Sequence, residues 1–249
     1  MNRPLSIPSF LVILVALLAL AWWTQQVPHL LTVTPMSEDE VLHSELGGDF
    51  RVFWAAGHIV ATGDPRKVYD RTEIAKQDTL RELRPDQAIA QSLFYPPLVL
   101  PALAWLGDKP FAEAWLIYEG GSLLLLAVAV VLAFPRQVWA LPVAAGFGGL
   151  WLALDFGQNT VLLTALYLLA LACLPLKEVR LGAVLALASF KPHFGLVIPL
   201  WLILRRSWVA VLAASVFTVA LVGLNVYAYG PEIWEDYLGS LQAASDRLA

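Results

Sequence analysis

Long apolar runs separated by short polar connections are the dominant pattern along the chain. A helix needs about 20 mainly apolar residues to cross the hydrocarbon core of a bilayer. Runs that approach or reach this length occupy residues 7–24, 111–134, 138–154, 160–176 and 208–228, and another run is divided into 180–190 and 194–204. With the two divided pieces as an ascending and a descending half, the pattern predicts about seven transmembrane helices.

The first run can be interpreted in two ways. Arg3 precedes it and Ala19-Leu20-Ala21 resembles a cleavage site, as in a secretory signal peptide. Trp22 and Trp23, however, continue the run as an interfacial aromatic pair. We therefore favour an uncleaved membrane anchor.

Composition supports an all-α polytopic membrane bundle. The chain is 59% hydrophobic and only 14% charged, and its mean hydropathy is +0.67, values that do not describe a water-soluble domain. A net charge of -4 does not suggest nucleic-acid binding. The single cysteine, Cys173, excludes an internal disulfide or a cysteine metal cluster.

A polar island, residues 34–92, interrupts this pattern after the first run and holds half of the chain's charged residues. It belongs to a loop, residues 34–110, in which 50–61 is predicted to form an amphipathic helix lying in the membrane interface. Residues 95–106 are too short to cross and contain three prolines, so we expect a re-entrant or interfacial helix there.

Basic residues in the short connections predict the orientation of the helices. If Arg3, Arg136, Lys177 with Arg180, and Arg205 with Arg206 are cytoplasmic, the spans alternate consistently. The loop 34–110 and the tail 229–249 then lie outside, with the bundle 111–228 between them. One outer face would gather the polar island, residues 155–159, residues 191–193 and the tail.

Two charged residues on that face are candidates for chemistry. Asp49 precedes the predicted helix 50–61 and is either its N-cap or a general base. Lys191 lies where the run 180–204 is divided, and each half is too short to reach the far surface. We expect the ammonium to be recessed in a cavity, with a ligand phosphate or Asp155 as its partner, because an unpaired charge at that depth is costly.

An ordered set of short motifs resembles glycosyltransferase family 87. The set spans about residues 47–206 and consists of Gly48-Asp49-Phe50, Ala55-Ala56, Gly63-Asp64-Pro65, Val68-Tyr69, Phe94-Tyr95-Pro96-Pro97, Gly157-Gln158-Asn159, Gly182 and Lys191-Pro192. The resemblance implies a membrane enzyme of the GT-C fold, in which a helical extracytoplasmic loop separates the first two spans. It also implies inverting transfer of mannose or a related sugar from a polyprenyl phosphate carrier.

The resemblance further implies that Asp49 is the catalytic base and that Lys191 binds the departing phosphate. His193 would assist at the phosphate or bind the acceptor, or be hydrogen-bonded beside the helix break. Gln158 and Asn159 would bind sugar hydroxyls or cap the turn. Tyr95 would line the cavity or be structural, and Arg51 is either a further binding residue or a solvated side chain.

The expected partners are a polyprenyl phosphate sugar donor, a glycan or glycolipid acceptor and membrane lipid, with no cofactor. No metal site is expected, because Glu38-Asp39-Glu40 is better explained as a flexible acidic loop. The expected location is a bacterial plasma membrane, with the active site on the extracytoplasmic side.

Two other functions remain open on the sequence. A membrane transporter or lipid-handling protein would also use an intramembrane Lys191 and a broken hairpin, although no internal repeat is visible. A non-catalytic partner of a transferase is the third possibility. Members of the resembled family usually continue beyond the segment that ends here at Ala249, so the chain is expected to be a short variant or a fragment.

Overall fold

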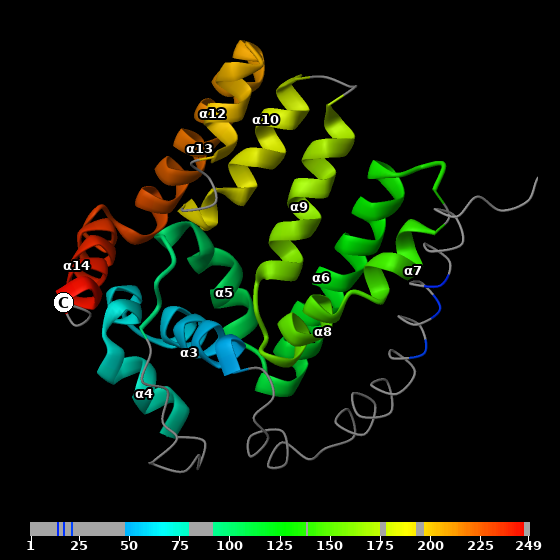
Figure 1. Cartoon of the computed structure of the whole chain (residues 1–249). Coiled ribbons are helices and arrows are strands. Elements are labelled where there is room, and N and C mark those ends of the chain that lie inside the picture. Colours follow the sequence, from blue (N-terminus) through cyan, green and yellow to red (C-terminus); the bar gives the residue numbers. More distant parts are fainter. Residues whose placement is uncertain are drawn as a thin grey trace, which may run out of the picture.

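A computed structural model describes residues 14, 17, 21, 48–79, 92–137, 139–174, 178–192 and 197–246. All regular structure in these ranges is helical, which confirms the predicted all-α class for the described part (Figure 1). The elements are α3 Gly48–Thr62, η1 Pro65–Tyr69, α4 Arg71–Thr79, η3 Pro97–Val99, α5 Leu100–Gly107, α6 Phe111–Ala133, α7 Ala140–Ala145, α8 Gly148–Asp155, α9 Thr160–Cys173, α10 Glu178–Leu187, η4 Ala188–Phe190, α12 Val197–Leu204, α13 Trp208–Tyr229 and α14 Glu232–Asp246.

The two longest helices, α6 and α13, are long and apolar enough to cross a membrane. Only 28% and 11% of the residues in their most apolar windows are buried within the structure. Large apolar side chains such as Leu124 and Val219 are 68% and 70% exposed. Helices that are apolar all round yet uncovered by protein suit a lipid environment, and these two match the predicted spans 111–134 and 208–228.

The other predicted spans are shorter or divided in the structure. The run 138–154 forms two short helices, α7 and α8, which are separated at Gly146 and Phe147. Gly146, Gly148 and Gly149 lie at this break and lower the helix propensity of the segment. The Trp151 indole N–H of α8 donates a 2.9 Å hydrogen bond to the carbonyl of Ala145, the last residue of α7. The run 160–176 gives α9, which has 14 residues. The first run, 7–24, lies outside the described residues except for three positions, so the count of seven spans stays a prediction.

The run 180–204 is divided as expected. α10 and η4 end at Phe190, Lys191 has a non-helical backbone with φ −122° and ψ 80°, and α12 follows from Val197. The cause is Pro192, since a proline disfavours the helical conformation in the residue before it. The break places the lysine in a turn, outside the helices on either side.

α6, α9, α10, α12 and α13 form the bundle, in which α9 packs between α6 and α10, and α13 packs against α10 and α12 (Figure 1). The contact between α10 and α13 is close at Gly182, where an added Cβ would lie 2.6 Å from the carbonyl oxygen of Ala210. Small residues at such a crossing allow two membrane helices to approach closely.

The second part of the fold is the α3 layer, which consists of α3, η1, α4, α5 and α14. Its core includes Phe50 and Ala56, both 0% exposed. The predicted helix 50–61 is therefore present, and its apolar side chains pack within the protein over most of its circumference. The reason is tertiary packing, because α5 covers one side of α3 and α6 contacts another. The location of this helix in the membrane interface stays a prediction.

The tail helix α14 joins this layer. Ile233 is fully buried in its core, and Arg66 of η1 donates hydrogen bonds of 2.6 and 3.0 Å to the two carboxylate oxygens of Asp236. Arg66 and Asp236 are 170 positions apart in the sequence, so the polar island and the tail form one structural unit although they lie far apart along the chain.

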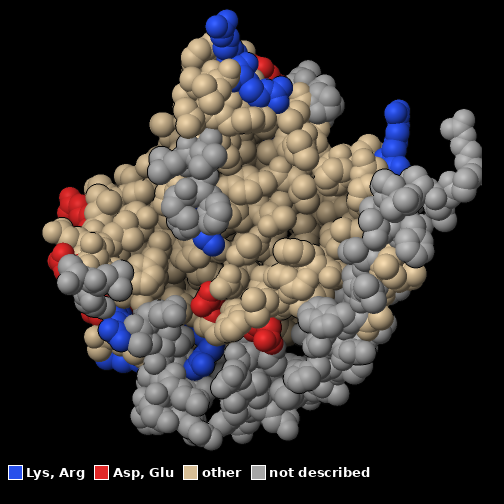
Figure 2. All heavy atoms as spheres, in the orientation of Figure 1, with Lys and Arg blue, Asp and Glu red and all other residues tan. Residues whose placement is uncertain are grey.

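Charged side chains are distributed unevenly over the surface (Figure 2). Lys and Arg gather over the ends of α10 and α12, and charges of both signs lie over the α3 layer. Glu178 and Arg180 belong to the first turn of α10, and Arg205 and Arg206 directly follow α12. The broad surface between these ends is mainly uncharged. This distribution is the one expected for a bundle with apolar sides and two polar ends.

The contact between α3 and α5 depends on two glycines. A Cβ added at Gly57 would overlap the carbonyl of Leu103, and one added at Gly107 would overlap the backbone of Gly57. We expect Gly57→Ala to lower the free energy of unfolding by more than about 3 kcal/mol, since backbone atoms cannot move aside as a side chain can. Thermal unfolding of the purified protein in detergent measures the change.

The matched control is Gly120→Ala, at another helical glycine, whose added Cβ meets nothing within 4 Å. Relief of the glycine penalty should make this variant equal to or about 1 kcal/mol more stable than the wild type. Equal stability of the two variants would show that close packing at Gly57 is unimportant.

Candidate functional site

A small polar cavity lies where the α3 layer meets the bundle. Its volume is about 170 Å³, and it is lined by Asp49, Val52, Phe53, Ser92, Phe94, Tyr95, Lys191 and Pro192. Three of the residues singled out in the sequence, Asp49, Tyr95 and Lys191, therefore meet in space although they come from three distant segments. The fold places a carboxylate, a phenol and an ammonium around one cavity.

Asp49 lies in the first turn of α3. The expectation that it is the N-cap of a helix over 50–61 is therefore not met, because the residue is itself helical. Its backbone N–H donates a 2.9 Å hydrogen bond to the carbonyl of Phe156. This bond satisfies one of the unpaired donors at the helix start and joins α3 to the turn after α8.

Opposing effects act on the pKa of the Asp49 carboxyl group. Burial raises the pKa of this carboxyl group, while the positive charge of Lys191 and a hydrogen bond from Gln158 lower it. The net shift is upward, because desolvation is the largest effect. A carboxylate with a raised pKa binds a proton more strongly, which suits a general base.

Gln158 is positioned for its contact with Asp49 by the turn between α8 and α9. The turn passes through Gly157, whose φ of +63° strongly favours glycine. The hydroxyl of Thr160 donates a 3.3 Å hydrogen bond to Oε1 of Gln158. The amide NH₂ is then the group that faces the carboxylate, as a donor to Asp49 must.

Asn159 connects the two other polar groups of the cavity. Lys191 Nζ donates a 2.9 Å hydrogen bond to Asn159 Oδ1, and Asn159 is only 5% exposed. Because an ammonium can only donate, this contact sets the orientation of the amide and leaves its NH₂ to donate to Tyr95. That hydrogen bond lowers the pKa of Tyr95 against a larger upward effect of burial.

Lys191 is half-buried, and desolvation lowers its pKa, whereas the negative charge of Asp49 raises it. The sequence suggested Asp155 as the carboxylate partner of this lysine, but Asp155 is exposed. Asp49 is instead the carboxylate that acts on Lys191. The predicted recessed position of the ammonium is confirmed by its place in the cavity wall.

Arg51, another of the predicted site residues, is not brought to the cavity. It is half-buried on α3, two residues after Asp49. Residues two apart in a helix point to different sides, which explains the separation. His193 lies outside the described residues, so its role stays a prediction.

Tyr118 is a neighbour of the site that sequence analysis missed. Its ring stacks on Phe50 with 4.9 Å between ring centroids, and its buried hydroxyl has no hydrogen-bond partner in the described part of the chain. The residue lies within the apolar sequence of α6, so no local motif distinguishes it. Only the packing of α3 against α6 brings it near Asp49.

Glu119, the next residue on α6, is buried, and among the described residues neither of its carboxylate oxygens has a hydrogen-bond partner. Glu113, six residues earlier, is exposed. The two residues therefore lie in different environments, and neither lines the polar cavity.

Two apolar grooves lie beside the polar cavity. One has a volume of about 440 Å³ and shares Phe53 and Tyr95 with the cavity. The other has a volume of about 580 Å³ and shares Pro192 with the cavity. Polar groups at the end of an apolar groove form a site suited to an amphiphile with a polar head and a long apolar chain.

No cluster of three or more potential metal ligands of the His, Cys, Asp and Glu types occurs among the residues that the structure describes. The acidic segment Glu38-Asp39-Glu40 falls outside them. The polar groups that line the cavity are instead suited to binding anionic and hydroxyl groups directly.

Comparison with known proteins identifies one family. The model of glycosyltransferase family 87 matches residues 93–249. This region includes Tyr95, Gln158, Asn159 and Lys191, whereas Asp49 precedes it. No curated protein and no solved structure matches the chain.

The electrostatic link across the cavity can be tested directly. Since Lys191 lowers the pKa of Asp49, Lys191→Met should raise that pKa above its wild-type value. An isotope-edited infrared titration of the Asp49 carboxyl group measures the shift. Lys67→Met, which removes an exposed lysine of η1, is the matched control and should leave the titration unchanged. An unaltered Asp49 titration in Lys191→Met would mean that the two charges do not interact.

Proposed function

The chain belongs to glycosyltransferase family 87 and is a glycosyltransferase, and from this premise we propose that it transfers mannose from a polyprenyl phosphate carrier. The acceptor is a hydroxyl group of a glycan or glycolipid, and the anomeric configuration is inverted. The reaction takes place at the extracytoplasmic face of a bacterial plasma membrane. The observation that carries this proposal is the pairing of Asp49 and Lys191 in one small cavity.

Asp49 acts as the general base in this mechanism. It removes the proton of the acceptor hydroxyl while the hydroxyl oxygen attacks the anomeric carbon of the sugar. The raised pKa of the carboxyl group supports this role, because a stronger base assists proton removal more effectively. The proton ends on the carboxylate and the new glycosidic bond forms in the same displacement.

Lys191 acts on the leaving group. As the bond between the anomeric carbon and the phosphate oxygen breaks, negative charge accumulates on the polyprenyl phosphate. An ammonium held in place before the reaction stabilises that charge. The hydrogen bond from Lys191 to Asn159 supports this role, since it keeps the ammonium in the cavity.

Asn159 and Tyr95 have different roles from those that the sequence suggested. Asn159 is almost fully buried and is occupied by Lys191 and Tyr95, so we assign it to positioning these side chains. Tyr95 accepts a hydrogen bond from Asn159, which leaves its own O–H to donate into the cavity. A sugar hydroxyl or the phosphate is the natural acceptor of that bond, and Gln158 is left to hold Asp49.

The polyprenyl chain is assigned to the apolar groove that shares Phe53 and Tyr95 with the cavity. Burial of apolar chain in such a groove is favourable at about 25 cal/mol per Å². This energy acts equally on the bound donor and on the transition state, so it contributes to donor affinity and not to the rate of the chemical step.

A transporter or lipid-handling protein was the main alternative. Family membership assigns an enzymatic function, and a base and a cation facing the same cavity suit group transfer. The alternative is therefore set aside, together with a non-catalytic partner role.

The charge distribution also supports the orientation that we propose for the spans. The site borders the α3 layer, to which α14 belongs, whereas Arg180, Arg205 and Arg206 belong to the ends of α10 and α12 that lie away from this layer (Figures 1 and 2). Basic residues are retained on the cytoplasmic side. The α3 layer and the cavity are then extracytoplasmic.

Replacement of Asp49 by Asn tests the proposed base. The amide keeps the shape of the side chain but cannot take the proton, so transfer should fall by roughly 10²–10⁴-fold while donor binding and folding persist. Membranes containing the variant are assayed with radiolabelled polyprenyl phosphate mannose and with other polyprenyl phosphate sugars, which also identifies the sugar.

Asp155→Asn is the matched control, because this carboxylate is exposed at the end of α8, next to the turn that carries Gln158. It should retain nearly full activity. Retention of more than a few per cent of the wild-type rate by Asp49→Asn would demote Asp49 to a structural residue.

Single cysteines test the topology in a Cys173→Ser background, which removes the native thiol. Arg71→Cys and Arg205→Cys place thiols at exposed positions of the α3 layer and of the basic end. A membrane-impermeant maleimide should label position 71 in intact cells and position 205 only after permeabilisation. Labelling of both positions from the same side would rule out this topology.

A further inference from the structure

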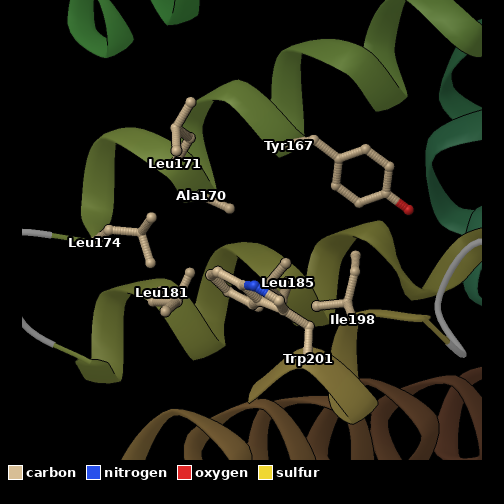
Figure 3. A pocket seen from close by; sticks show the side chains of 8 residues that line it. All are labelled: Tyr167, Ala170, Leu171, Leu174, Leu181, Leu185, Ile198 and Trp201. Carbon is tan, nitrogen blue, oxygen red and sulfur yellow. The ribbon is translucent and has the colours of Figure 1, made fainter. Parts of the chain in front are cut away.

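A further apolar pocket lies between α9, α10 and α12 (Figure 3). Its volume is about 370 Å³, and its lining side chains are Tyr167, Ala170, Leu171, Leu174, Leu181, Leu185, Ile198 and Trp201. None of these residues lines the polar cavity or the groove assigned to the polyprenyl chain, whereas Leu185 and Ile198 also line the other apolar groove.

The pocket runs along the helices and has two ends. Leu174, Leu181 and Trp201 lie near the ends of their helices at the basic end of the molecule. Tyr167 lies seven residues before Leu174 on the α9 segment, roughly 10 Å deeper at about 1.5 Å per residue, and Figure 3 shows these two side chains at opposite ends of the pocket. A chain entering at the basic end would therefore run parallel to the helices, as lipid chains do.

The end of the pocket near Trp201 carries positive charge. The guanidinium of Arg205 lies over the Trp201 ring, 4.8 Å from its centroid, and Arg180 precedes the lining residue Leu181. A guanidinium stacked on an aromatic ring keeps its N–H donors along its rim. Arg205 can therefore remain on the tryptophan and bind a phosphate at the same time.

We propose that this pocket binds an anionic phospholipid of the surrounding membrane, with an acyl chain in the pocket and the headgroup phosphate on Arg205. Two observations select this ligand. The lining is almost wholly apolar, which suits a hydrocarbon chain, and the cation beside the mouth selects a negatively charged headgroup. Basic sites between transmembrane helices are a recurrent means of binding acidic lipids.

The site is distinct from the donor site. Arg180 precedes Lys191 by eleven residues of α10 and η4, roughly 16 Å of helix, so one phosphate cannot contact both ends. The proposal does not depend on the sugar-transfer chemistry, and an inactive Asp49→Asn protein should bind the lipid as well as the wild type does.

Native mass spectrometry of the purified chain tests the proposal with two defined lipids, phosphatidylglycerol and phosphatidylcholine of the same acyl composition. The wild type should retain phosphatidylglycerol preferentially. Arg205→Gln should weaken that retention about fivefold, the usual effect of one basic residue near the membrane surface. Arg136→Gln removes another exposed arginine, from the connection after α6, and should change retention less than twofold.

A second pair of variants tests the pocket itself without changing charge. Ile198→Trp fills the deep part of the pocket and should lower phosphatidylglycerol retention, whereas Val128→Trp, on the exposed surface of α6, should not. Thermal unfolding confirms that each variant is folded.

Three results would overturn the proposal. They are equal retention of the two lipids by the wild type, equal losses in Arg205→Gln and Arg136→Gln, and displacement of phosphatidylglycerol by polyprenyl phosphate. The last result would assign the pocket to the carrier chain and leave the proposed transfer reaction intact.

Discussion

The cost of holding an ammonium inside an apolar bundle is the constraint on which the site depends. Lys191 is placed there by the break before Pro192, and a charge in such surroundings needs polar partners. Asn159 supplies an oxygen at 2.9 Å, and Asp49 supplies a negative charge. Each partner is itself held, Asn159 by its place at the start of α9 and Asp49 by the bond from its N–H to Phe156. The requirement to stabilise one charge thus brings three distant segments together.

Packing outside the cavity keeps these segments in register. Gly57 and Gly107 allow α3 and α5 to approach to backbone contact, and the buried amide of Asn225 donates a 2.7 Å hydrogen bond to the carbonyl of Pro97. This second contact joins α13 to the segment that carries Tyr95. A base and a cation must be held to within a fraction of an ångström to be effective, and rigid packing on both sides of the cavity provides that precision.

Sequence analysis predicted the two long apolar helices and singled out residues that the structure brings together at the polar cavity, because each has a local signal. The apolar runs of α6 and α13 determine those helices, a proline after Lys191 determines the break, and short motifs indicated Asp49, Tyr95, Gln158 and Asn159. It could not predict the burial of α3, the role of Asn159 in orienting Lys191, or the proximity of Tyr118. These depend on contacts between segments that are far apart in the sequence, and local patterns carry no information about them.

The most direct test of the central claim, that Asp49 and Lys191 form one reaction centre, is an experimental structure of the protein with polyprenyl phosphate bound. The account predicts the phosphate within hydrogen-bond distance of Lys191 Nζ, the prenyl chain in the groove beside Tyr95, and the Asp49 carboxylate facing the remaining space where an acceptor hydroxyl would lie. A phosphate bound away from Lys191, or an Asp49 carboxylate turned out of the occupied cavity, would contradict it.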